Sequence, residues 1–277
     1  MATSGSARIL AIVGAIVLLW PLGSAVIGTW TAGSRHSGGS LFAALATAAV
    51  LVVQARAIIA GRAEASRAAV FGLAAATLLY VYAMRVDVWA LAGVAAIGVA
   101  ASLLRIAHGR AGLRAAWPAI GMAVFIVPPP ASLVGVMQTR FSLWIAEILA
   151  TVMSWLLDEG VVASGTEVRF ATTTVPIVDE CSGMGGILIA APFAMTMALL
   201  LRLPVGWRMA LLLVTAPLLA AAANLLRVLV MGLMVGVGRA DLVATPWIHE
   251  LLGAIPLVAA GLSIWALAKV LRPRRSR

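Results

Sequence analysis

The sequence predicts an all-α polytopic membrane protein, and its composition and the placement of its charges are the reasons. Hydrophobic residues make up 63% of the 277 residues and charged residues only 11%, with a mean hydropathy of +1.07. A soluble fold cannot bury so large an apolar fraction, whereas helices that span a membrane expose it to lipid. We therefore expect about eight transmembrane helices, an interfacial helix and a short extended element on the outer face.

The expected spans are apolar runs long enough to cross about 30 Å of hydrocarbon at about 1.5 Å per residue. They are residues 9–29, 41–60, 68–84, 88–104, 115–128, 183–201, 209–235 and 248–270. The first run follows Arg8, so a cleaved secretory signal ending near Gly23 remains an alternative to a first span. We expect one membrane-embedded domain over 1–277: N-terminal helices (1–128), an outer-face segment (129–182) and C-terminal helices (183–277).

The basic residues predict the orientation. With eight crossings and both ends in the cytoplasm, 14 of the 20 basic residues lie on the inner side, including the C-terminal group from Lys269 to Arg277. Only five lie on the outer side, and Arg227 alone lies deep within a span. This asymmetry follows the positive-inside rule, so the formal charge of +10 indicates membrane topology and not nucleic-acid binding.

The segment 129–182 is predicted to stay on the outer face. Residues 141–157 are apolar enough to cross, but a crossing there would move the Arg-rich C-terminus outside. We expect an interfacial or re-entrant helix with Trp144 and Trp155 as anchors. The three prolines 128–130 end the preceding helix. Residues 160–178 are rich in β-branched residues around a Ser164-Gly165 turn, which predicts a short extended or hairpin element.

Cys181 is the only cysteine, and it directly precedes the sixth expected span. A single cysteine excludes an intrachain disulfide and cysteine-rich metal sites, and the chain has no Gly-rich phosphate loop, so we expect no cofactor and no metal. Ser182 and Gly183 follow the thiol at the start of a helix, where the dipole favours a thiolate. The negative charge of the neighbouring Glu180 disfavours ionisation of the Cys181 thiol, so a thiolate would need a cation nearby.

Two residues in the last two spans are candidates to act with this thiol. Arg227 lies about eight residues, roughly 12 Å, inside the seventh span, and an unpaired arginine there is costly. Asn224 shares its helix face by i, i+3 spacing. His249, next to Glu250, begins the eighth span at the same outer surface as Cys181.

In their order, the motifs D-E-C-S-G at 179–183, N-L-L-R at 224–227 and H-E-L-L-G at 249–253 resemble the exosortase/archaeosortase family of membrane-embedded cysteine transpeptidases. The resemblance extends upstream through the prolines, the interfacial helix and G-V-V-A-S-G-T-E-V, and so covers roughly the C-terminal half of the chain.

The resemblance implies a cysteine endopeptidase or transpeptidase of the cytoplasmic (inner) membrane with its site on the outer side. Cys181 would be the nucleophile, His249 the proton-transfer group and Arg227 the group that positions or stabilises charge. Its substrates would be exported proteins with a C-terminal motif, a transmembrane helix and a basic tail. Thiolate attack would form a thioacyl intermediate, which an acceptor then resolves.

Two other interpretations are open. A hydrolytic cysteine protease would use the same three residues but let water resolve the intermediate. A transporter or a non-catalytic assembly factor would use Arg227 as a substrate or counter-ion site, and would not need Cys181.

Overall fold

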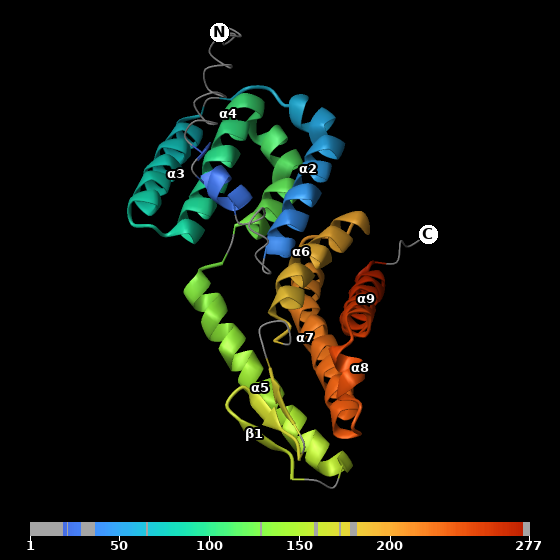
Figure 1. Cartoon of the computed structure of the whole chain (residues 1–277). Helices are drawn as coiled ribbons and strands as arrows, with labels where there is room; N and C mark the ends of the chain where they lie inside the picture. Colours follow the sequence, from blue (N-terminus) through green and yellow to red (C-terminus); the bar gives the residue numbers. More distant parts are fainter. Residues whose placement is uncertain are drawn as a thin grey trace. The chain divides into compact units, whose positions relative to one another are not determined.

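The computed structural model describes residues 19–20, 22–28, 37–64, 66–127, 129–157, 160–171, 173–177 and 182–273. These residues are mostly helical, with one small sheet, as expected for an all-α membrane protein (Figure 1). The chain divides into two compact units, Met1–Pro130 and Ala131–Arg277.

The first unit contains the helices α2 (Ser37–Ile59), α3 (Arg67–Arg85) and α4 (Trp89–Ala123), followed by a 3₁₀ turn, η1 (Val124–Ile126). Residues 19–20 and 22–28 are also helical, but most of the expected first span, 9–29, lies outside the described residues. Helices α2 and α3 coincide with the runs 41–60 and 68–84. Ser66 caps α3, since its side chain accepts a hydrogen bond from the backbone N–H of Ala69.

Helix α4 is two helical segments that meet at Gly109. Gly109 has φ 64° and ψ −169°, which no helix accommodates. A Cβ on Gly93, near the start of α4, would lie 2.5 Å from the side chain of Val127. A straight helix would separate these two positions by about 50 Å, so the chain turns back at Gly109 (Figure 1). The first segment coincides with the run 88–104, and the run 115–128 begins in the second segment and continues into η1.

The second unit begins with α5 (Ala131–Leu157) and continues with three short strands, β1 (Val162–Ser164), β2 (Glu167–Arg169) and β3 (Thr174–Pro176). The strands form an antiparallel sheet in the order β1-β2-β3, with Ser164 opposite Glu167 across the Gly165 turn. The expected extended element is therefore present. The unit ends with α6 (Met184–Leu200), α7 (Trp207–Gly236), α8 (Ala240–Ala244) and α9 (Pro246–Leu271).

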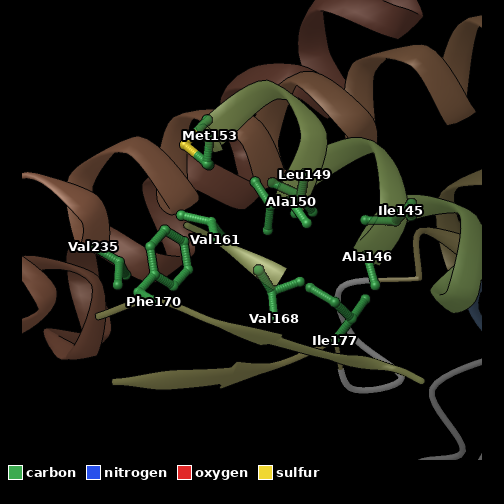
Figure 2. Close-up of a cluster of buried hydrophobic side chains, with 11 residues drawn as sticks. Ile145, Ala146, Leu149, Ala150, Met153, Val161, Val168, Phe170, Ile177 and Val235 are labelled. Atoms are coloured by element: carbon green, nitrogen blue, oxygen red, sulfur yellow. The ribbon is translucent and has the colours of Figure 1, made fainter. Parts of the chain in front are cut away.

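A hydrophobic cluster joins α5, the sheet and the C-terminal part of α7. Figure 2 shows side chains of α5, such as Leu149, facing Val168 and Ile177 of the sheet segment, with Val235 of α7 beside Phe170. Helix α5 also packs directly on α7: a Cβ on Gly232 would lie 2.4 Å from Leu149 Cδ1. The cluster therefore fixes the sheet and α5 to the end of α7 that follows Arg227.

Among the described residues, six helices are long and apolar enough to cross a membrane, and α6, with 17 residues, is a shorter apolar helix. The 38-residue candidate Trp89–Ile126 includes the turn at Gly109. The protein is thus a multi-pass helical membrane protein, but the number eight is not confirmed. The interfacial helix expected at 141–157 is not confirmed either, because α5 is a continuous helix of 27 residues that starts at Ala131 and is itself a candidate span.

Candidate functional site

The candidate site lies in the second unit, where α7 and α9 bring a guanidinium and an imidazole together. Arg227 lies nine residues before Gly236, the last residue of α7, and His249 lies in the first turn of α9, which Pro246 begins. The distance from Arg227 Nη2 to His249 Nε2 is 3.1 Å. The two groups are both partly buried, although 22 residues separate them in the sequence.

The direction of this hydrogen bond follows from the chemistry of the two groups. An arginine side chain has only donors, so Nη2 donates and His249 Nε2 accepts. The contact therefore requires a neutral ring with its proton on Nδ1, since an imidazolium has no free lone pair. In this arrangement Nε2 is the ring nitrogen that can take up a proton.

Gly253 completes the surface of α9 that faces Arg227. It lies one turn after His249, and a Cβ there would be 3.6 Å from Arg227 Cζ. The guanidinium thus lies against α9 at two successive turns, at His249 and at Gly253. Gly253 ends the motif H-E-L-L-G but was not among the predicted site residues, although its i+4 spacing from His249 places it on the same helix face.

The start of α6 approaches α7 closely at Asn224. Gly183 precedes α6 with φ 74°, and a Cβ on it would lie 2.6 Å from both Cγ and Nδ2 of Asn224. Only glycine tolerates both this backbone conformation and this close approach. Asn224 is one helical turn before Arg227 on α7. The N-terminal ends of α6 and α9 therefore contact neighbouring turns of α7.

Ser182 is buried, with 1% of its surface exposed. Its hydroxyl oxygen accepts a hydrogen bond from the backbone N–H of Met184 at 3.4 Å, in the first turn of α6. Glu250 follows His249 but is exposed. Cys181 and Glu180 lie outside the described residues.

The structure therefore brings together Arg227 with His249 and Gly183 with Asn224, two pairs that share one face of α7. Ser182 lies beside the second pair in the sequence, and the exposed Glu250 is not part of either pair. Among the described residues, no group of three His, Cys, Asp or Glu side chains is placed to hold a metal ion.

A comparison with protein families identifies the chain. The family model for the transmembrane exosortase, Exosortase_EpsH, matches residues 30–266. The chain belongs to the exosortase family. The match includes the three motifs and also the N-terminal helices from residue 30, which lie outside the C-terminal half covered by the resemblance. No curated protein and no solved structure matches the chain at a significant level.

Proposed function

We propose that this exosortase family member cleaves the C-terminal sorting signals of exported proteins through a thioacyl intermediate on Cys181 and transfers the new C-terminus to an acceptor. The observation that carries the proposal is the 3.1 Å contact between Arg227 and His249. It places a proton acceptor and a permanent cation side by side in a chain whose family processes sorting signals.

The position of Cys181 in the chain supports its role as the nucleophile. Two peptide units separate it from Gly183, and consecutive Cα atoms are about 3.8 Å apart, so the Cα of Cys181 lies within about 8 Å of that of Gly183. Gly183 is in contact with Asn224, one turn from Arg227. Cys181 is therefore two residues along the chain from a position that approaches the turn of α7 before Arg227.

In the first step His249 takes the proton of the Cys181 thiol. Nε2 is the unprotonated nitrogen, so Arg227 withdraws its N–H from Nε2 as the proton arrives. The resulting imidazolium has two N–H donors and no longer accepts from Arg227. Proton transfer therefore releases the guanidinium for another acceptor, and the cation also stabilises the thiolate.

In the second step the thiolate attacks the scissile carbonyl carbon and the carbonyl π electrons move to oxygen. The released guanidinium donates hydrogen bonds to this oxyanion. When the C–N bond breaks, the imidazolium gives its proton to the departing amine nitrogen, which leaves a thioester on Cys181 and a neutral His249.

In the third step a nucleophile on the acceptor attacks the thioester carbonyl. His249 takes the proton of the nucleophile and the Cys181 thiolate departs, which restores the enzyme after reprotonation. Water in place of the acceptor would give plain hydrolysis with the same residues.

The substrates are exported proteins whose C-terminus carries a short motif, a transmembrane helix and a basic tail. The enzyme lies in the cytoplasmic membrane with Cys181 on the outer side. This orientation is supported by the basic residues at the opposite ends of α6, α7 and α9, namely Arg202, Arg208 and Lys269.

The test compares the C-termini of membrane proteins by mass spectrometry in cells that carry wild-type protein or Cys181→Ala at equal abundance. Proteins with a C-terminal helix and a basic tail keep these tails only in the mutant if the proposal holds. The mass of the new C-terminus in wild-type cells distinguishes transfer from hydrolysis, because an acceptor adds its mass and water does not.

Identical profiles in wild type and Cys181→Ala would overturn the proposal. A second variant separates catalysis from assembly. Arg208→Gln, at the other end of α7 from Arg227, leaves processing unchanged, whereas a loss of processing in this variant indicates a general defect of the bundle.

A further inference from the structure

An apolar groove lies between α6 and α9, away from the candidate site. Its volume is about 440 Å³, and its lining is almost entirely apolar. The residues that line it are Phe193, Met197, Leu257, Val258, Gly261, Leu262 and Trp265. Leu257 and Trp265 follow His249 by 8 and 16 residues, so the groove runs from about 12 to 24 Å along α9 from the imidazole. It is thus separate from the Arg227–His249 pair.

Gly261 leaves the room for this groove. A Cβ at this position would lie 3.7 Å from Phe193 Cζ, at ordinary contact distance. Gly261 therefore adds no side chain to the lining, and a side chain longer than a methyl group at this position would project into the groove or against Phe193.

One end of the groove carries a positive charge. Lys269 Nζ lies 4.0 Å from the centroid of the Trp265 ring, and Trp265 lines the groove. Arg272 follows Lys269 at the C-terminal end of α9 and is exposed. An ammonium on the face of a tryptophan is stabilised by the ring and remains available for an anion.

A third cation lies at the same end of the unit. Gly261 is beside Phe193, and both Met197 and Trp265 line the groove further along their helices, so α6 and α9 run in the same direction (Figure 1). Their C-terminal ends therefore lie at one surface. Arg202, just after α6, is exposed there.

We propose that this groove binds one anionic phospholipid, with an acyl chain along Gly261 and the phosphate at Lys269. An apolar groove alone fits any hydrocarbon. The ammonium at its end selects an amphiphile with a negative headgroup, because a zwitterionic headgroup carries its own cation next to the phosphate. The C-terminal end of α9 faces the cytoplasmic leaflet in the predicted orientation, and that leaflet carries the anionic lipids.

The experiment is native mass spectrometry of the full chain, purified in detergent and incubated with equal amounts of phosphatidylglycerol and phosphatidylcholine that carry the same acyl chains. Wild-type protein retains phosphatidylglycerol in preference to phosphatidylcholine. Lys269→Gln lowers this preference about fivefold, the contribution expected of one lysine near a lipid phosphate. Gly261→Leu fills the groove and reduces the retention of both lipids.

Arg208→Gln is the matched control. Arg208 also lies over a tryptophan, 5.4 Å from the ring centroid of Trp207, but neither residue lines the groove. This variant keeps the wild-type preference. Equal retention of the two lipids by wild-type protein overturns the proposal, as does an unchanged preference in Lys269→Gln. Lys269 is exposed, so this variant decides the question even if Gly261→Leu does not fold.

Discussion

At the scale of single residues, the arginine at position 227 matters through its shape as well as its charge. Its guanidinium reaches His249 with one nitrogen while its carbon lies near the Gly253 position. A guanidinium has five donors in a fixed plane, whereas a lysine ammonium is a compact point charge on a flexible stem. An arginine can therefore donate a hydrogen bond to the imidazole and then to an oxyanion without changing its position.

Arg227→Lys is expected to keep the charge and still lower the rate of substrate processing about 100-fold, the usual cost of losing one oxyanion donor. The rate is measured by pulse-chase of a tagged substrate at equal enzyme abundance. Arg208→Lys, at the start of the same helix, is the control and processes substrate at the wild-type rate. If Arg227→Lys matches wild type, a simple positive charge is sufficient and the donor role assigned to Arg227 is wrong.

Gly183 is the position near the site at which an added side chain would clash with Asn224. Gly183→Ala places a methyl group within 2.6 Å of the Asn224 amide, at φ 74°. Gly165→Ala is the matched control, because Gly165 has φ 63° and nothing within 4 Å of its Cβ position. Both variants pay the left-handed strain of about 1–3 kcal/mol, and only Gly183→Ala adds a clash.

We therefore expect a lower melting temperature for Gly183→Ala than for Gly165→Ala in detergent, and loss of processing only in the former. Equal melting temperatures would mean that the Asn224 side chain moves aside at little cost, in which case the start of α6 is not held by this contact.

At the scale of elements, α5 is fixed to the second unit through its C-terminal half. Leu149 is 1% exposed and packs in the cluster of Figure 2, whereas Leu133, earlier in the same helix, is 51% exposed. The sheet, α5 and the C-terminal part of α7 therefore form one packed layer beside the turn of α7 that carries Arg227.

Leu149→Ala is expected to destabilise the protein by about 2–5 kcal/mol, since it leaves a cavity between α5 and α7. Leu133→Ala removes the same atoms from an exposed position and has little effect. Thermal unfolding of the two variants in detergent, followed by circular dichroism, measures the difference. A similar melting temperature for both would show that the cluster does not hold α5 in place.

At the scale of the whole molecule, the charges at the ends of the helices decide which surface faces outward. Cys181 is the only cysteine, so Cys181→Ala yields a chain without thiols into which single cysteines are placed. Gly206 and Gly238 precede and follow α7, and Gly135 and Gly160 lie near the two ends of α5. At each of the four positions a Cβ would have no neighbour within 4 Å.

A membrane-impermeant maleimide, applied to right-side-out vesicles, is expected to label Gly238→Cys but not Gly206→Cys, because basic residues gather at the Gly206 end. We expect it to label both Gly135→Cys and Gly160→Cys, since a crossing by α5 would place the basic ends of α6, α7 and α9 outside. Labelling of only one of the α5 positions would make α5 a crossing. Labelling of Gly206→Cys in place of Gly238→Cys would reverse the proposed orientation.

Hydropathy alone predicted where α2, α3, α6, α7 and α9 lie, because a membrane span needs a long apolar run whatever it packs against. It did not predict that α5 begins at Ala131, because Gln138 and Arg140 lower the local hydropathy without breaking a helix. The gap between the runs 88–104 and 115–128 predicted that the chain reverses there, but not that it does so at the single residue Gly109, because the backbone torsion of one residue cannot be read from hydropathy.

For the site, the sequence by itself determined which chemical groups are present: one thiol, one deep arginine and a histidine at the start of a late helix, in an order that resembles the family that the chain is now shown to belong to. Only the tertiary structure decided that Arg227 contacts His249, that Gly253 lies against the guanidinium, and that Gly183 has no room for a side chain beside Asn224. The physical reason is that the apolar pattern of a helix shows how far it extends, whereas contacts between helices depend on their rotation and on the small residues at which they approach.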